Sequence, residues 1–228
     1  IRETALTEAE IAELKNISEL KTADEIEKVL RNIKALKLDS SMKLTESRIS
    51  KNENGYIMNL SLYNEDEKNY HSMSVSVDAK TGKLLSLYNY SDNYSKDELT
   101  DKLKANSEAA ILKFLEEYAG DELAQCTKME SDSSRNNYTM NYRRLVNGVP
   151  YINNGIYASY DGLNDMLVSY SLNFDKNGEF KNPKGAISGD EAYNKILKEA
   201  PLNVMYVLSE GKYKLCYTLD YKNYIRID

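Results

Sequence analysis

The chain has 228 residues, 41% hydrophobic and 29% charged, a composition typical of a globular protein with a real core. Its 36 acidic and 30 basic residues are mixed along the chain and give a net charge of −6. The pair Arg143-Arg144 is the largest basic cluster, which disfavours nucleic-acid binding. No apolar run approaches the roughly 20 residues of a membrane-spanning helix, so we expect no membrane insertion.

The first 36 residues of the sequence predict two helices. A capping-box pattern at Thr7–Glu10 predicts an N-terminal helix within residues 1–21, and a second at Thr22–Glu25 predicts a longer helix with apolar residues at helical spacing from Ile26 to Leu36. Because the chain starts at Ile1, we take it as a mature or trimmed fragment. The missing leader then says nothing against secretion.

After Asp39 the apolar period changes from helical to two, which predicts strands. Turn residues at Asn54-Gly55 and at Asp78–Gly82 separate strand pairs. The run Ser72–Val77 alternates strictly and predicts one apolar and one serine face. Together with the preceding helix, these strands predict a first unit, residues 22–94, with strands near Met42–Ile49, Tyr56–Leu62, Tyr70–Val77 and Leu84–Tyr90.

A polar linker at 91–105 leads to a predicted helix from Ser107 to Tyr118, with Gly120 as its stop and a possible short helix capped near Ser95 before it. A second unit, residues 95–178, then has strands near Leu123–Met129, Tyr138–Leu145, Tyr151–Tyr160 and Met166–Phe174. Ser188 is predicted to cap a third helix, and residues 179–228 to form a partial third unit with strands near Leu202–Leu208 and Tyr213–Leu219.

The three units repeat one pattern. Tyr56, Tyr138 and Tyr213 each begin a strand with apolar residues two and four places on, and Val77-Asp78 corresponds to Tyr160-Asp161 at a spacing of about 82–83 residues. Such self-similarity predicts one supersecondary module used repeatedly, a helix followed by antiparallel strands.

Two segments resemble a known family. Tyr142–Tyr151 (YRRLVNGVPY) resembles the YcdB/YcdC-type repeated domain of bacterial secreted proteins, which is PepSY-like, and Val77–Leu85 (VDAKTGKLL) resembles the PepSY-type hairpin. The resemblance covers roughly residues 22–228. One departure is Asn173-Phe174, where many relatives carry Trp.

This resemblance implies an α+β fold of tandem cystatin-like, PepSY-like units, each a helix packed on a curved antiparallel sheet of three to four strands. It also implies an extracytoplasmic setting, commonly in Gram-positive bacteria and beside cell-wall-anchoring modules. PepSY domains are associated with peptidase propeptides and with proposed peptidase inhibition.

The side chains that usually carry chemistry are few. His71 is the only histidine, so the paired imidazoles of common zinc sites are missing, and we expect it at the solvated surface. Cys126 and Cys216 lie outside any C-x-x-C pattern; half-buried free thiols are favoured, and a disulfide stays open. Glu116 and Glu117 are adjacent on a helix and therefore face different ways.

The loop residues Asp161, Asn164 and Asp165 suggest calcium, but their spacing lacks the pattern of an EF-hand loop. Asp78 occupies the matching turn of the first unit without further acids, which favours a turn role for both aspartates. We therefore assign no catalytic, cofactor-binding or metal-binding residues and expect no cofactor.

These observations favour a non-catalytic, monomeric module outside the cytoplasm that binds a protein or peptide partner through the polar face of its sheets. The high tyrosine content, 19 residues, is typical of a sheet-rich fold, and Tyr-bearing strands would also supply flat, amphipathic anchors for recognition. The alternatives are binding of a cell-wall polymer or carbohydrate, and an enzyme with an unrecognised hydrolytic site. Strand alternation predicts outward-facing Asn59, Ser74, Ser76, Asn141 and Ser169, and buried Met58, Leu60, Val75, Val77, Leu85, Met140, Tyr142, Ile156, Val168 and Leu215.

Overall fold

The computed structural model describes residues 8–52, 54–64, 66, 69–92, 97–175, 178–200 and 202–219. The chain divides into two compact units, residues 1–180 and residues 181–228, which are taken separately below.

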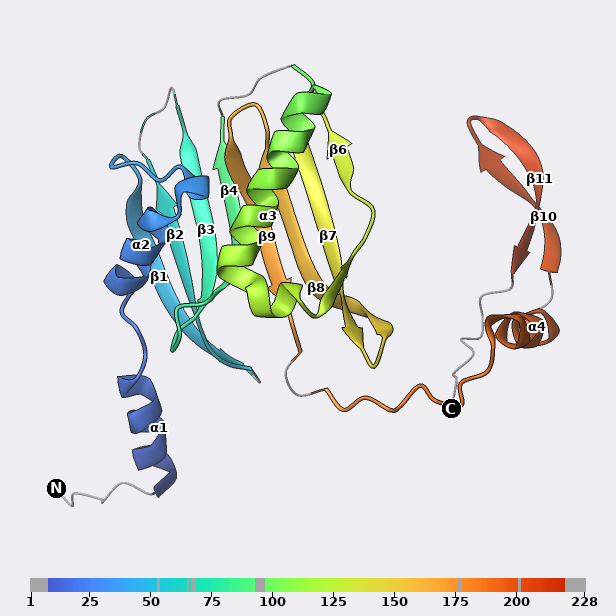
Figure 1. Ribbon diagram of the computed structural model, residues 1–228, viewed down its shortest axis with the longest axis horizontal. Coiled ribbons are helices and arrows are strands. Elements are labelled where there is room, and N and C mark those ends of the chain that lie inside the picture. The colour runs from blue at the N-terminus through green and yellow to red at the C-terminus, as the bar shows by residue number, and fades with distance from the viewer. Residues whose placement is uncertain are drawn as a thin grey trace. The chain divides into compact units, whose positions relative to one another are not determined.

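In residues 1–180 nine strands form one antiparallel sheet (Figure 1). Its strand order is β1-β2-β3-β4-β9-β8-β7-β5, with β6 pairing on β7. The expected α+β class is therefore confirmed, and the strands that the sequence divided between two units lie in one large antiparallel sheet. Only β6 has no counterpart in the sequence prediction. The strands are β1 (Lys43–Asn52), β2 (Gly55–Tyr63), β3 (His71–Asp78), β4 (Leu84–Ser91), β5 (Cys126–Lys128), β6 (Asp132–Ser134), β7 (Asn137–Val146), β8 (Val149–Asp161) and β9 (Met166–Asn173).

Three α-helices and a 3-10 turn accompany this sheet: α1 (Glu8–Ser18), α2 (Ala23–Asn32), η1 (Lys34–Leu36) and α3 (Asp101–Leu123). The capping box of α2 is confirmed, because Thr22 accepts from the Glu25 N–H and the Glu25 carboxylate accepts from the Thr22 N–H. The capping-box residue Thr7 and the cap suggested at Ser95 lie outside the described residues.

Helix α3 is longer than predicted at both ends. Thr100 caps it, within the stretch that the sequence assigned to a linker, and the helix runs past Gly120 to Leu123 with a kink at Ala119, where φ is −142°. Gly120 therefore does not stop the helix. A glycine inside a helix costs only about 1 kcal/mol relative to alanine, and packing of the surrounding turns can offset that cost.

Helices α2 and α3 lie on the same face of the sheet, and α3 crosses β7, β8 and β9 (Figure 1). The core lies between these helices and the apolar face of the strands, as the period-two pattern predicts. Leu115 of α3 and Leu36 of η1 are fully buried there. Six of the residues predicted to be buried are confirmed, namely Met58, Leu60, Val75, Val77, Met140 and Ile156.

Leu85 and Val168 are half-buried rather than buried, because each lies at a β-bulge. On β3–β4, Val77 pairs with Leu84 but Ser76 pairs with Ser86, so Leu85 is the extra residue. On β8–β9 the register shifts in the same way around Val168. The buried side chains are Leu84 and Leu87 on β4, and Leu167 and Tyr170 on β9. Tyr142, also predicted to be buried, is only half-buried.

Residues 181–228 contain α4 (Gly189–Glu199) and a two-stranded hairpin of β10 (Leu202–Ser209) and β11 (Lys212–Leu219). The predicted capping box at Ser188 is confirmed by its reciprocal hydrogen bonds with Glu191. Leu215, predicted to be buried, is 63% exposed, so that prediction is wrong. A two-stranded hairpin has too few neighbours to bury alternate side chains, and no described residue of α4 is buried.

Candidate functional site

The sheet face opposite α2 and α3 is polar and open. Because side chains alternate along each strand, the residues between the core positions point to this face. Strand pairing aligns them in two rows across β2, β3, β4, β9, β8 and β7. One row is Asn59, Ser76, Ser86, Ser171, Tyr157 and Asn141, and the other is Ser61, Ser74, Tyr88, Ser169, Ser159 and Thr139.

The five residues predicted to face outward all belong to these rows. Asn59 and Ser74 are exposed, and Ser76, Asn141 and Ser169 are half-buried. The apolar-in, polar-out alternation of the sequence is therefore confirmed at these five positions.

Three adjoining hollows of about 650, 580 and 430 Å³ mark this open face, and Ser171 lines all three. The strands and the turns at their ends provide the residues that line them. Within the rows, Ser76 donates to Asn59 and Thr139 donates to Ser159. The other row side chains make no hydrogen bond within the described part of the chain, so their polar groups are available to a ligand.

Charged side chains flank the open face at both ends. Glu46 and Arg48 of β1 line the hollow of about 580 Å³, and Glu130 and Arg143 line that of about 650 Å³. None of the four forms an ion pair within the described residues. The face thus combines a centre of hydroxyls and amides with one acid and one base at each end.

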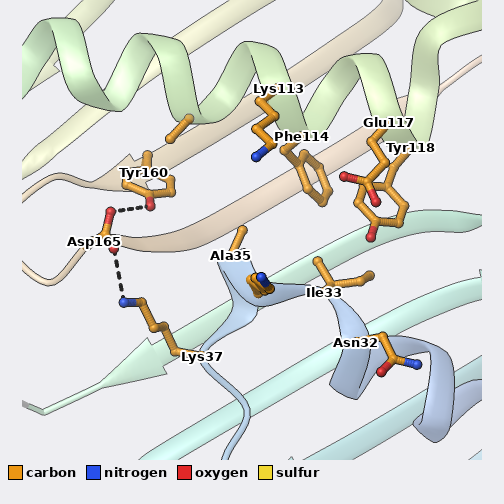
Figure 2. Close-up of a pocket in the computed structure, with 12 residues that line it drawn as sticks. Asn32, Ile33, Ala35, Lys37, Lys113, Phe114, Glu117, Tyr118, Tyr160 and Asp165 are labelled. Carbon is orange, nitrogen blue, oxygen red and sulfur yellow. Dashed lines mark hydrogen bonds and ion pairs between the residues drawn. The ribbon is translucent and has the colours of Figure 1, made fainter.

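A separate cavity, of about 550 Å³, lies on the helix side between η1 and α3 (Figure 2). Tyr160 donates to one oxygen of Asp165 at 2.7 Å, and Lys37 donates to the other at 3.0 Å. The Tyr160 hydrogen bond, followed by that from Lys37, lowers the pKa of Asp165. These bonds tie η1 to the β8–β9 turn, so this polar cluster has a structural role.

Two phenols at this helix-side cavity stay protonated near neutral pH. Burial is the main cause that raises the pKa of Tyr160, and it raises the pKa of Tyr118 to about 12, with a further contribution from a hydrogen bond to Glu117. Of the adjacent acids Glu116 and Glu117, Glu117 lines the cavity. The pair therefore does not converge on one place.

We expected His71 at the solvated surface, but the structure shows that it is half-buried. Its Nε2 lies 2.6 Å from Oδ1 of Asn89, which is 1% exposed. Nδ2 of Asn89 donates to the carbonyls of Leu36 and Leu167, at 3.1 Å each, so Oδ1 faces the histidine and Nε2 must donate. The lone histidine thus belongs to a structural network that joins η1, β3, β4 and β9.

The two cysteines are free, half-buried thiols, as favoured from the sequence. Burial is the main cause that raises the pKa of Cys126 to about 11, and the nearby Arg144 offsets part of that effect. A thiol with such a pKa carries little thiolate at neutral pH and is a poor nucleophile.

Asp78 and Asp161 each accept hydrogen bonds within the turn in which they lie, as predicted. Oδ1 of Asp78 accepts from the backbone N–H groups of Lys80 and Thr81, and Oδ1 of Asp161 accepts from those of Leu163 and Asn164. The other oxygen of Asp161 accepts from Asn136 and Asn164 side chains. Among the residues that the structure describes, no group of three or more His, Cys, Asp or Glu side chains could hold a metal ion.

The sequence did not single out Arg143, Gly155 or Asn173 as site residues. Their shared feature is cross-strand pairing, since Gly155 lies opposite Arg143 on β7 and Asn173 on β9. The sequence placed Gly155 within the predicted strand Tyr151–Tyr160, but only the pairing of β8 with β7 and β9 shows which residues lie beside it.

The family model described as the YcdB, YcdC repeated domain matches residues 36–174, which include all nine strands of the large sheet. The chain belongs to the YcdB, YcdC repeated-domain family. The resemblance noted in the sequence is thereby confirmed.

One solved structure, that of the Bacillus megaterium YpeB C-terminal domain, is similar to this repeated-domain protein. It shares 16% sequence identity with a TM-score of 0.54, and the match covers 88% of this chain and 87% of the YpeB chain. At this identity the likeness supports the fold alone. The comparison with curated proteins gave no match.

In the described part of the chain, no helix has both the length and the apolar character needed to cross a membrane.

Proposed function

We propose that this member of the YcdB, YcdC repeated-domain family is a non-catalytic binding module of the cell envelope or extracellular space, monomeric by itself, that binds a peptide segment of a protein partner on its open sheet face. The observation that carries the proposal is the continuous polar face with three adjoining hollows that share Ser171. Unpaired amides and hydroxyls can bond the amide groups of an extended peptide, and exposed tyrosines supply flat anchors.

The same proposal covers the tandem, cystatin-like arrangement of PepSY-like units at residues 22–94 and 95–178, after an N-terminal helix in residues 1–21. Leu87 of β4 pairs with Tyr170 of β9, and these two residues are counterparts in the alignment that matches Asp78 with Asp161. Pairing of counterparts is what a pseudo-two-fold axis between two like units produces. The equivalent bulges at Leu85 and Val168 also support it.

Away from the β4–β9 pairing, the strand registers of the two units differ. Asp78 lies opposite Ile57, whereas Asp161 lies opposite Asn137 rather than Thr139, the sequence counterpart of Ile57. The register of β7 against β8 therefore differs by two residues from that of β2 against β3, and Tyr56 and Tyr138 do not occupy matching positions. Residues 179–228 would be a partial third unit.

A non-catalytic role agrees with how the reactive side chains are used. His71 donates to a buried amide, and Asp165 accepts from Tyr160 and Lys37. The raised pKa of Cys126 disfavours its thiolate. The contacts of His71 and Asp165 thus stabilise the fold, and the Cys126 thiol is a poor nucleophile.

Carbohydrate or cell-wall polymer binding is the second candidate. Tyr88 and Tyr157 belong to opposite rows of the open face and are 58% and 37% exposed, so each can offer a ring beside hydroxyls and amides. The charged residues at both ends of the face favour a peptide, which can carry charges of both signs.

Arrays of octapeptides and of neutral glycans, probed with the purified chain, test the proposal. We expect binding to peptides, loss of that binding in Ser171→Arg, which places a large side chain where the three hollows meet, and retention in Lys113→Ala on the helix side. Equal binding by Ser171→Arg, or glycan binding alone, would contradict it.

A screen against peptidase, esterase and glycosidase substrates tests the enzyme alternative. Turnover abolished by changing His71 or a single carboxylate would overturn the non-catalytic assignment.

A further inference from the structure

The largest hollow of the open face, about 650 Å³, differs from the other two because it places an unpaired guanidinium beside a glycine. We call it the Gly155 hollow; its lining includes Asn141, Arg143, Asn153, Gly155, Tyr157 and Asn173. It lies over β7, β8 and β9, at the end of the face away from β1.

Gly155 is required by the backbone at this place. Its φ is +150°, and a Cβ added there would lie 2.0 Å from the carbonyl oxygen of Tyr142. Strand β8 can therefore approach β7 here only without a side chain. The result is a stretch of bare backbone between Arg143 on one strand and Asn173 on the other.

Arg143 and its neighbour Arg144 have opposite roles. Arg144 donates to the carbonyl of Asp175 at 2.7 Å and stacks on Phe174 with its guanidinium carbon 4.9 Å from the ring centre. Arg143 is half-buried on the open face, and its guanidinium has no hydrogen bond or ion pair within the described residues. A guanidinium offers five N–H donors in a fork that matches a carboxylate.

Neutral hydrogen-bonding side chains line the same hollow. The side chains of Asn141 and Tyr157 have no partner in the described part of the chain, while Asn173 donates to the carbonyl of Asn153 at 2.6 Å. Glu130 is the one acidic residue lining the hollow. The hollow is thus suited to a ligand that presents a carboxylate next to amide groups.

We infer that the Gly155 hollow binds a carboxylate of the peptide ligand, with Arg143 as the bidentate donor and Asn141 and Tyr157 bonding the adjacent amide groups. This inference rests on the proposed function, since it assigns one group of the peptide to one end of the open face. The carboxylate is either the free C-terminus or an aspartate side chain, and both present the same planar acceptor to Arg143.

The test uses three versions of one set of uncharged octapeptides: with a free C-terminus, with a C-terminal amide, and amidated with one internal aspartate. Dissociation constants for the whole chain are measured in 150 mM NaCl. We expect at least one carboxylate version to bind about tenfold or more tightly than its neutral amide, the size of a charge-assisted hydrogen bond. Which version gains identifies the source of the carboxylate.

The decisive variants are Arg143→Gln and Arg48→Gln. Both arginines are unpaired on the open face, but Arg48 lines a hollow at the other end. Arg143→Gln should abolish the carboxylate preference, with the fold checked by circular dichroism, while Arg48→Gln should keep it. Arg143→Lys should restore only part of it, because lysine lacks the fork.

Three results would overturn the inference: equal affinity for the three peptide versions, an unchanged preference in Arg143→Gln, or an equal loss of preference in both glutamine variants. Binding of tri-galacturonic acid that depends on Arg143, without peptide binding, would assign the hollow to sugar acids and also overturn it. Neutral peptides that bind without a carboxylate preference would refute this inference alone. Absence of all peptide binding would refute the proposed function as well.

Discussion

Replacing Asn89 by leucine should destabilise the protein strongly although the two side chains are nearly equal in size. Its Nδ2 bonds two backbone carbonyls, those of Leu36 and Leu167, and its Oδ1 accepts from His71. A buried acceptor that loses its donor costs about 1–3 kcal/mol. With two carbonyls affected, Asn89→Leu should lower the free energy of unfolding by about 2–6 kcal/mol, since half-buried His71 can turn to water.

Urea unfolding followed by circular dichroism measures this loss, and Asn59→Leu on the open face provides the matched control. Asn59 is exposed and accepts one hydrogen bond from Ser76, so its replacement should cost less than about 1 kcal/mol. Hydrogen exchange should also rise at the β4–β9 pairing in the Asn89 variant. A loss below about 1 kcal/mol for Asn89→Leu would show that the two carbonyls do not depend on this amide.

Three further predictions follow from burial and charge. Leu84→Ala should lower the free energy of unfolding by about 2–5 kcal/mol and Leu85→Ala by clearly less, because the bulge buries Leu84 and leaves Leu85 half-exposed; equal losses in urea melts would contradict the bulge. Cys126, with a pKa raised to about 11, should be about one part in a thousand thiolate at pH 8 and react with Ellman's reagent far more slowly in the native chain than in urea; an equal rate would refute this assignment. Asp165 has a lowered pKa in the folded state, so its contribution to stability is present above the unfolded value near 3.8 and is lost as pH falls through the folded value. Asp165→Asn should therefore be less stable than the wild type at pH 6, by under about 1 kcal/mol for this largely exposed pair, and the difference should shrink as pH falls below about 3.8; a difference that stays constant in acid would have another cause.

The sequence by itself determined the fold class, most strand positions and the polar character of the open face. Each of these depends on local periods: the alternation in Ser72–Val77 separates an apolar face from a serine face, and the capping boxes at Thr22 and Ser188 mark helix starts. The resemblance carried by Tyr142–Tyr151 likewise rests on contiguous residues, and the family match confirms it. The turn roles of Asp78 and Asp161 follow from hydrogen bonds to residues two and three places on, which spacing alone can suggest.

Only the tertiary structure decided how the strands are joined and which side chains meet. The pairing of β4 with β9 places Leu87 against Tyr170, and no local pattern encodes a contact between such distant residues. The bulges that expose Leu85 and Val168 arise because one strand carries an extra residue relative to its partner, which single-strand alternation cannot reveal. For the same reason the place of Arg143 beside Gly155 and Asn173 became visible only with the register, since cross-strand neighbours are set by pairing and not by order in the chain.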